Sequence, residues 1–350
     1  VTVERVSGGL SWGWGGHNLI RYNRVEGLAL GGRFESDLAS PRGPLSFQAL
    51  GFLGLADLEP KVRLSLERQS LTRRIALGAY RELQPTHRRG RHMGFGSSLN
   101  ALLLGRDYGE YYLATGADLL WRSPATSRQA FELRVYGERQ DPLETKTDFS
   151  LLHAFDGDWE FRPNVAGDGA DEVGAELHLA PWWGTDPLQP QVGLELYGHG
   201  AAWRAPDSTV TGEYFRASAM VRVALPLGSR SWRVGLEAGA GTTWGSAPSQ
   251  RRWFVGGPRS LRGYDAGTLS GSSFTRGRLE VARAFSVWGV SAFGDVAWAG
   301  PADELDSANL LYGLGLGASF MDGLFRVDIC RGLTDPHQDF RVEFYLDAVL

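Results

Sequence analysis

Apolar and polar residues alternate one by one along many segments of this chain. The pattern is clearest over 61–67, 131–136, 172–179, 215–223 and 341–348. Successive side chains of a β-strand point to opposite faces, so each segment would form a strand with one apolar and one polar face. A chain built from many such strands is restricted to all-β folds, either a soluble sandwich or a membrane barrel.

Segment length and the chemistry of the polar face distinguish these two folds. The segments run for about ten residues, the length that a tilted strand needs to cross a bilayer, whereas soluble strands centre on about five or six. Arg and Glu recur on the polar face, as a wet lumen allows. Aromatic residues recur near segment ends, as in interfacial girdles, at Trp121, Trp203, Trp232, Trp244, Trp288 and Trp298. We therefore predict a closed antiparallel transmembrane β-barrel rather than a sandwich.

Composition excludes several other classes. The 350 residues include 47 Gly, which disfavours helix interiors, and no apolar run is long enough for a transmembrane helix. A net charge of −4 argues against nucleic acid as a partner. Cys330 is the single cysteine, so an intrachain disulfide is excluded. Because no export signal is recognisable, the chain is expected to be a mature form or a fragment of an integral protein of the bacterial outer membrane.

The alternation predicts sixteen strands, an even number as bacterial single-chain barrels prefer. They cover 23–34, 45–54, 61–69, 73–83, 110–121, 129–139, 145–155, 171–180, 190–200, 212–225, 231–243, 272–285, 288–298, 311–320, 324–332 and 339–349. We therefore assign 23–350 to the barrel and 1–22 to an N-terminal extension or a segment in the lumen or periplasm. Connections in the second half alternate long and short, which fits surface loops on one side and periplasmic turns on the other.

One long connection, 84–109, does not fit this alternation. By the strand count it joins the fourth and fifth strands and falls on the periplasmic side, where short turns are expected. Either the count is wrong by one strand, or 98–112 forms a short amphipathic helix at the periplasmic rim.

A second long connection, 244–271, contains a motif rich in glycine. The motif reads FVGGPRSLRGY over 254–264 and includes Gly256, Gly257, Leu261, Arg262, Gly263 and Tyr264. It resembles the loop-six signature of the BamA/TamA (bacterial surface antigen) superfamily, which also includes two-partner-secretion transporters. The resemblance implies that 244–271 joins strands eleven and twelve of sixteen and folds back into the lumen.

Two segments after this loop extend the resemblance. GRLEVARAF (277–285) and VSAFGDVAWAG (290–300) are similar to the next two strands of the superfamily, whose lumen-facing acids correspond to Glu280 and Asp295. A loop that folds inside loses conformational freedom, so it needs an attachment. The guanidinium of Arg262 offers five donors and stays charged, and we expect it to pair with both acids rather than lie in solvent.

The resemblance implies a protein that inserts polypeptide into the outer membrane or translocates it across. A client strand would pair at the seam between 23–34 and 339–349. The superfamily's assembly members carry POTRA domains that receive clients, and none is recognisable here, so a structural barrel that anchors a partner domain or subunit is an alternative. A passive pore is the second alternative. A seam with few paired residues would favour insertion, a fully paired seam would favour anchor or pore, and a plugged lumen would count against a pore.

The expected partners are the lipid bilayer, including lipopolysaccharide, and a polypeptide client or partner protein; no cofactor is implied. No serine stands at a recognisable spacing from the strand histidines, so we expect no catalytic site. These histidines are His153, His178 and His199.

Two further clusters give weak signals of binding. The basic cluster over 87–92 is typical of a solvated loop or a lipid-phosphate site. Its His87 and His92 lack a third metal ligand. The acids between 156 and 171 do not have the spacing of an EF-hand, so we expect no metal site there. These acids are Asp156, Asp158, Asp168 and Asp171.

Overall fold

The computed structural model of the protein describes residues 8–11, 19–38, 40, 44–87, 92–124, 129–184, 186, 189–206, 208–228, 231–307, 309–321, 325–336 and 340–346. Two compact units divide the chain. Unit 1 contains 1–178, 199–214 and 245–251, and unit 2 contains 179–198, 215–244 and 252–350. Within the described ranges there are nineteen strands, of which seventeen belong to one sheet and two pair with each other.

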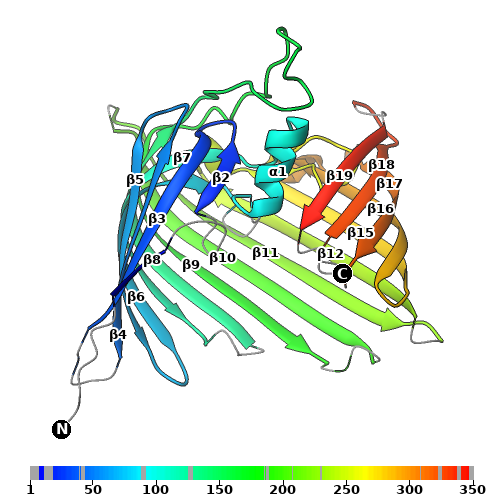
Figure 1. Cartoon of the computed structure of the whole chain (residues 1–350), viewed down its shortest axis with the longest axis horizontal. Helices are drawn as coiled ribbons and strands as arrows, with labels where there is room; N and C mark the ends of the chain where they lie inside the picture. Colours follow the sequence, from blue (N-terminus) through cyan, green and yellow to red (C-terminus); the bar gives the residue numbers. More distant parts are fainter. Residues whose placement is uncertain are drawn as a thin grey trace. The chain divides into compact units, whose positions relative to one another are not determined.

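Unit 1 contains a run of antiparallel strands that follow one another in the chain and lie side by side (Figure 1). Its elements are β1 (Gly8–Ser11), β2 (Ile20–Asn23), β3 (Gly27–Leu38), β4 (Leu45–Gly54), β5 (Pro60–Gln69), β6 (Arg74–Pro85), α1 (Phe95–Leu104), β7 (Tyr111–Arg122), β8 (Gln129–Pro142) and the 3-10 helix η1 (Ser249–Arg251). Each of the strands β3 to β8 pairs with the next one in the sequence, residue by residue and without interruption, which is the pattern of an up-and-down meander.

Unit 2 contains the second antiparallel run, in which β12 pairs with β15 and each later strand pairs with the next. Its elements are β12 (Trp232–Gly245), β13 (Trp253–Val255), β14 (Leu269–Gly271), β15 (Ser273–Ala284), β16 (Trp288–Gly300), the 3-10 helix η2 (Ala302–Ser307), β17 (Leu311–Phe320), β18 (Phe325–Gly332) and β19 (Phe340–Leu346). The last residue of β12, Gly245, belongs to unit 1. Three further strands are divided between the units: β9 (Ala170–Trp183), β10 (Gln191–Arg204) and β11 (Thr211–Pro226).

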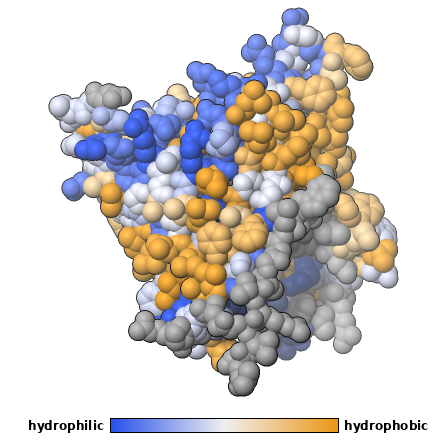
Figure 2. All heavy atoms as spheres, turned by 60° about the vertical axis from the view of Figure 1, so that its left-hand side comes forward, coloured by the Kyte–Doolittle hydropathy of each residue, from blue (hydrophilic) through white to orange (hydrophobic). Residues whose placement is uncertain are grey.

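Charged side chains of these strands are buried, while their apolar neighbours are exposed. On β18, Phe325 and Ile329 are 45% and 53% exposed, whereas Asp328 is 0% exposed. On β7 of unit 1, Leu119 and Trp121 are exposed and Asp118 is buried. Seen from the side of β3 to β6, apolar residues gather in broad areas of the outward surface (Figure 2). This polarity is the reverse of that of a water-soluble protein and suits strands whose outer face meets lipid.

The first strand of the sheet is interrupted. Residues Gly8 to Ser11 of β1 pair with β3 from Ser36 back to Arg33, and Ile20 to Asn23 of β2 pair with β3 from Leu30 back to Gly27. The two short strands therefore run in the same direction along one edge of β3. Only residues 31 and 32 of β3 separate the two paired stretches, although residues 12–19 intervene in the chain.

Three strand predictions need correction. The predicted strand 23–34 begins later, at Gly27, because the side chain of Asn23 accepts the N–H groups of Val25 and Glu26 and forms a tight turn. Strand pairing also begins earlier than predicted, since β1 lies within 1–22 and β2 begins there. The predicted strand 145–155 does not exist, because the N–H groups of Leu151 and Leu152 donate to the last turn of α1 instead.

These errors cancel in the total number of strands, but they change which two strands the connection 84–109 joins. Counting β1 and β2 as one interrupted strand gives sixteen strands in the sheet, the predicted number. The connection 84–109, however, joins the fifth and sixth strands, not the fourth and fifth. It is therefore of the same odd-to-even class as the connection between β12 and β15, and the predicted count was wrong by one strand at this point, which was one of the two alternatives.

A helix also forms in that connection, over Phe95–Leu104 and not over the predicted 98–112. α1 ends at Gly105, whose φ of 68° places it in the left-handed region and whose N–H returns to the carbonyl of Ala101. None of the helices in the described ranges is long and apolar enough to span a membrane. α1 packs beside β2 in unit 1 (Figure 1).

Candidate functional site

Glycines shape the segment of unit 2 that carries the predicted motif. Gly256, Gly257 and Gly263 have φ values of 131°, 82° and 90°, which side chains other than glycine rarely adopt. A Cβ on Gly263 would lie 2.6 Å from the backbone of Arg331, so this residue also permits a close approach to β18. The N–H of Gly257 donates to the carbonyl of Tyr264 at 3.0 Å and closes the segment into a compact turn.

Arg262 projects from this turn onto the buried polar face of unit 2. Its Nε and Nη2 donate to the two carboxylate oxygens of Asp295, at 2.8 and 2.7 Å, and its backbone N–H donates to the same group at 3.0 Å. Its Nη1 donates to Glu280 at 2.9 Å and lies 3.6 Å from Asp328. The guanidinium also lies 3.4 Å from the centre of the Phe293 ring. The structure thus brings Arg262, Glu280 and Asp295 together.

Arginines of the neighbouring strands complete this group, which we call the Arg262 site. Arg326 on β18 donates to Glu280 at 2.6 Å and to Asp328 at 2.6 Å, so each acid has more than one cationic partner. Arg278 on β15 donates to Asp295 and to the carbonyl of Pro258 in the turn. Charges buried this deeply remain stable only when they are paired and hydrogen-bonded, as they are here.

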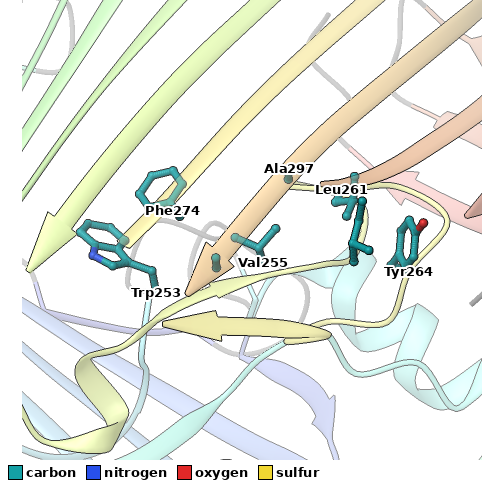
Figure 3. Close-up of a cluster of buried hydrophobic side chains, with 8 residues drawn as sticks. Trp253, Val255, Leu261, Tyr264, Phe274 and Ala297 are labelled. Carbon is teal, nitrogen blue, oxygen red and sulfur yellow. The ribbon is translucent and has the colours of Figure 1, made fainter. Parts of the chain in front are cut away.

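Tyr264 and Leu261 attach the same turn by packing. Both are fully buried and belong to an apolar cluster with Trp253, Val255, Phe274 and Ala297 (Figure 3). The hydroxyl of Tyr264 donates to the carbonyl of Tyr312 at 2.9 Å and lies 2.9 Å from the side-chain oxygen of Thr334. Each of the predicted motif residues therefore has a role in the structure of the turn. Together they fix the turn to β15, β16 and β18.

Unit 1 contains a second charged site that the sequence analysis missed. Arg251 of η1, just before the motif, donates to Glu172 at 2.5 Å and Glu138 at 3.3 Å, and its guanidinium lies over the Tyr112 ring. The preceding Gln250 donates to Gln140 at 2.7 Å. The signal available in the sequence was the run of Arg and Glu on the polar faces of 129–139 and 171–180, but it did not indicate a partner in the loop.

His199 lies in the same buried group as Glu172. Its Nε2 lies 2.7 Å from the hydroxyl of Tyr136 and 3.3 Å from that of Tyr214. Both hydroxyls also donate to Glu172, at 2.5 and 3.0 Å. The acid is therefore held by two tyrosines and Arg251, an arrangement that positions the start of the loop within unit 1.

The turn between β2 and β3 is a third buried charged group that was missed. Arg24 and Glu26 are both 0% exposed, which is unusual for a turn. Glu26 accepts from Arg21 at two oxygens, both at 2.8 Å, and lies 3.2 Å from the Lys61 ammonium. Burial opposes ionisation of Glu26, but the Arg21 and Lys61 charges and the Asn23 hydrogen bond outweigh it and lower the pKa of the carboxyl.

Other residues considered in the sequence have ordinary structural contacts. His153 stacks on Trp159 with ring centres 4.3 Å apart. Asp168 accepts from the N–H of Ser249, and Asp171 pairs with Arg204. In the described part of the chain no three His, Cys, Asp or Glu side chains form a group suited to a metal ion. Within the basic cluster 87–92, residues 88–91 lie outside the described ranges, as do Trp12, Trp14 and Leu350.

Comparison with known proteins bears on the fold. No family model and no curated protein matches this chain. Among solved structures, a BamA from Haemophilus ducreyi lacking POTRA domains 1–3 matches with a TM-score of 0.58 at 13% identity, over 98% of this chain and 71% of that one. At this identity the likeness concerns fold alone, and it supports an outer-membrane β-barrel.

Two further matches have TM-scores too low to support a conclusion. CdiB from Acinetobacter baumannii matches with a TM-score of 0.47 at 15% identity, over 93% of this chain and 57% of that one. OccK10 (OpdN) from Pseudomonas aeruginosa matches with a TM-score of 0.42 at 10% identity, over 95% of this chain and 97% of that one.

Proposed function

We propose that this chain closes into a sixteen-stranded barrel in the bacterial outer membrane and inserts polypeptide into that membrane or translocates it across. In this proposal the connection 244–271 folds into the lumen, where the Arg262 site holds it. Three observations support the barrel: the reversed polarity of the strands, the sixteen-strand count and the fold likeness to BamA. The lipid bilayer, including lipopolysaccharide, would surround it.

The interrupted first strand is the observation that carries the insertion activity. β3 has twelve residues, but β1 and β2 pair with only four each along this edge. Backbone N–H and C=O groups on a strand edge accept an added strand readily. A continuous client strand that displaced β1 or β2 would pair with more of β3 than either short strand does, which is β-augmentation. The proposed entry point is therefore an edge of β3, the strand that corresponds to the predicted 23–34, where β1 and β2 are the strands to be displaced.

A structural barrel that anchors a partner, and a passive pore, are the other candidates. The buried hydrogen bonds and ion pairs that attach 250–251 in unit 1 and the Arg262 turn in unit 2 argue against an open pore, because such contacts occupy the polar face. An anchor requires no open strand edge, so the interruption of the first strand favours insertion over anchoring.

A reversible crosslink across β3 tests the insertion activity. In a Cys330→Ser background, paired cysteines replace Ile20 and Leu30, which are register partners between β2 and β3. The purified protein in lipid vesicles is mixed with an unfolded outer-membrane barrel protein, and client folding is followed on semi-native gels. We expect the reduced protein to accelerate client folding and the oxidised protein to lose that acceleration.

A matched crosslink between β5 and β6 serves as the control. Cysteines in place of Leu66 and Leu77 join register partners away from the β3 edge, and their oxidation is expected to leave the acceleration intact. Client folding that ignores the β2–β3 crosslink would contradict the proposed entry point. Leakage of small sugars without any client folding would favour a pore, and neither activity would favour an anchor.

A further inference from the structure

The connection between β8 and β9 exposes an unusual group of apolar side chains. Phe155 is 104% exposed and Leu152 is 65% exposed, and Phe149 and Leu151 are about half exposed. We call these four residues the 149–155 patch. Single exposed apolar residues are normal on protein surfaces, but a contiguous group commonly marks a contact site.

Backbone hydrogen bonds to neighbouring elements hold this patch in place. The N–H groups of Leu151 and Leu152 donate to the carbonyls of Leu102 and Leu103 at 2.8 and 3.0 Å. These carbonyls belong to the last turn of α1, where a helix leaves such groups without partners of its own. The hydroxyl of Tyr22 donates to the carbonyl of Phe149 at 2.5 Å. The backbone of Phe149, Leu151 and Leu152 is thus fixed to α1 and β2.

The same connection buries other aromatic residues effectively. Phe161 is buried against Tyr22 and Ala101, and Trp159 packs on this cluster. The loop therefore has an apolar core against α1, and the 149–155 patch is what remains outside it. Exposure of the patch is a consequence of this packing, not of a loop without a core.

Acidic residues flank the patch in the sequence. Asp148, Asp156, Asp158 and Glu160 are all exposed, and residues 148–160 contain no Lys or Arg. Phosphate-bearing lipid headgroups carry negative charge, so they would be repelled by this rim. A protein surface with Lys or Arg around an apolar face would instead match it in both polarity and charge.

We propose that the 149–155 patch is a docking site for a protein segment that presents an apolar face bordered by Lys or Arg. Its apolar part would cover Leu152 and Phe155, and its cations would pair with the acidic rim. The proposal does not rest on the Arg262 site or on the insertion activity proposed above.

A contact-sensitive fluorophore tests the site. In a Cys330→Ser background, Phe155→Cys is labelled with bimane, which a nearby tryptophan quenches, and the protein is placed in phosphatidylcholine vesicles. The probes are three short peptides that contain one Trp: alternating Lys and Leu, alternating Glu and Leu, and alternating Lys and Ser. The control label is at Leu71→Cys, which is 97% exposed in the β5–β6 turn but has Arg68, Arg73 and Arg74 nearby.

Docking predicts quenching at position 155 by the Lys–Leu peptide only, and none at position 71. Combined Asp156→Asn, Asp158→Asn and Glu160→Gln substitutions should weaken this binding at least about tenfold, because rim charges guide such contacts. Quenching by all peptides, equal quenching at position 71, or none at position 155 would overturn the proposal. A blue shift of the label in vesicles without peptide would also overturn it, since Phe155 would then insert into lipid.

Discussion

Replacing Arg262 by Ala is the sharpest test of how the 244–271 connection is held. The substitution removes two side-chain hydrogen bonds to Asp295, one to Glu280 and the contact with the Phe293 ring. Asp295 would remain buried with only the longer contact to Arg278, at 3.4 Å, and the backbone N–H of residue 262. Breaking a buried ion pair by removing one partner destabilises by about 3–5 kcal/mol, because the other charge is left uncompensated.

The assay is the temperature at which the folded band is lost on semi-native gels, together with urea unfolding in detergent followed by tryptophan fluorescence. Arg262→Lys should recover part of the loss, since an ammonium keeps the charge but not the two-point contact with Asp295. The control is Arg222→Ala, which removes ion pairs to Glu195 and Glu237 from a side chain that is 46% exposed. Exposed pairs contribute only about 0–1 kcal/mol, so this variant should stay close to the parent protein.

The double variant Arg262→Ala with Asp295→Ala separates two explanations. If an uncompensated carboxylate causes the loss, removing it should make the double variant less destabilised than the sum of the single ones. An Arg262→Ala protein as stable as the Arg222→Ala control would refute the reasoning. Strict additivity in the double variant would show that Asp295 does not depend on Arg262.

Three further outcomes follow from the structure. Arg251→Ala should destabilise by about 3–5 kcal/mol in urea unfolding, as Glu172 loses its buried cation, and Glu172→Gln should add little in the Arg251→Ala background. Gly263→Ala should cost about 1–3 kcal/mol or more, because φ is 90° and the new Cβ would meet the β18 backbone; Gly32→Ala, with no atom within 4 Å of its Cβ, should change little, and equal effects would contradict this. The pKa of Glu26 is lowered on folding, so its carboxylate should stabilise the protein above the unfolded pKa of about 4.3 and lose this contribution as the pH falls through the folded pKa. The free energies of unfolding of the parent protein and Glu26→Gln, measured in urea, should therefore converge as the pH is lowered. A difference between the two proteins that does not depend on pH would exclude this.

The sequence alone determined the strands and their faces, because a period of two is a local property of the chain. The alternation over 61–67 and 131–136 corresponds to β5 and β8, with their polar residues turned inward. The motif residues could also be identified from the sequence, because Arg262 and Gly263 have distinctive chemistry and belong to a pattern that resembles that of a known family. The prediction of a strand over 145–155 was wrong, because the backbone of this segment forms hydrogen bonds with α1, which precedes it by about forty residues.

Only the tertiary structure decided which charges outside the Arg262 motif meet. Arg251, Glu172 and His199 are far apart in the sequence, and each is an ordinary polar residue of a loop or strand until the fold places them together. The interruption of the first strand was equally invisible, because four residues such as Ile20–Asn23 are too short for a periodic signal and become a strand through pairing with β3. Local alternation specifies which face a residue occupies, whereas the partners that compensate a buried charge depend on register and loop path, which are set by the whole chain.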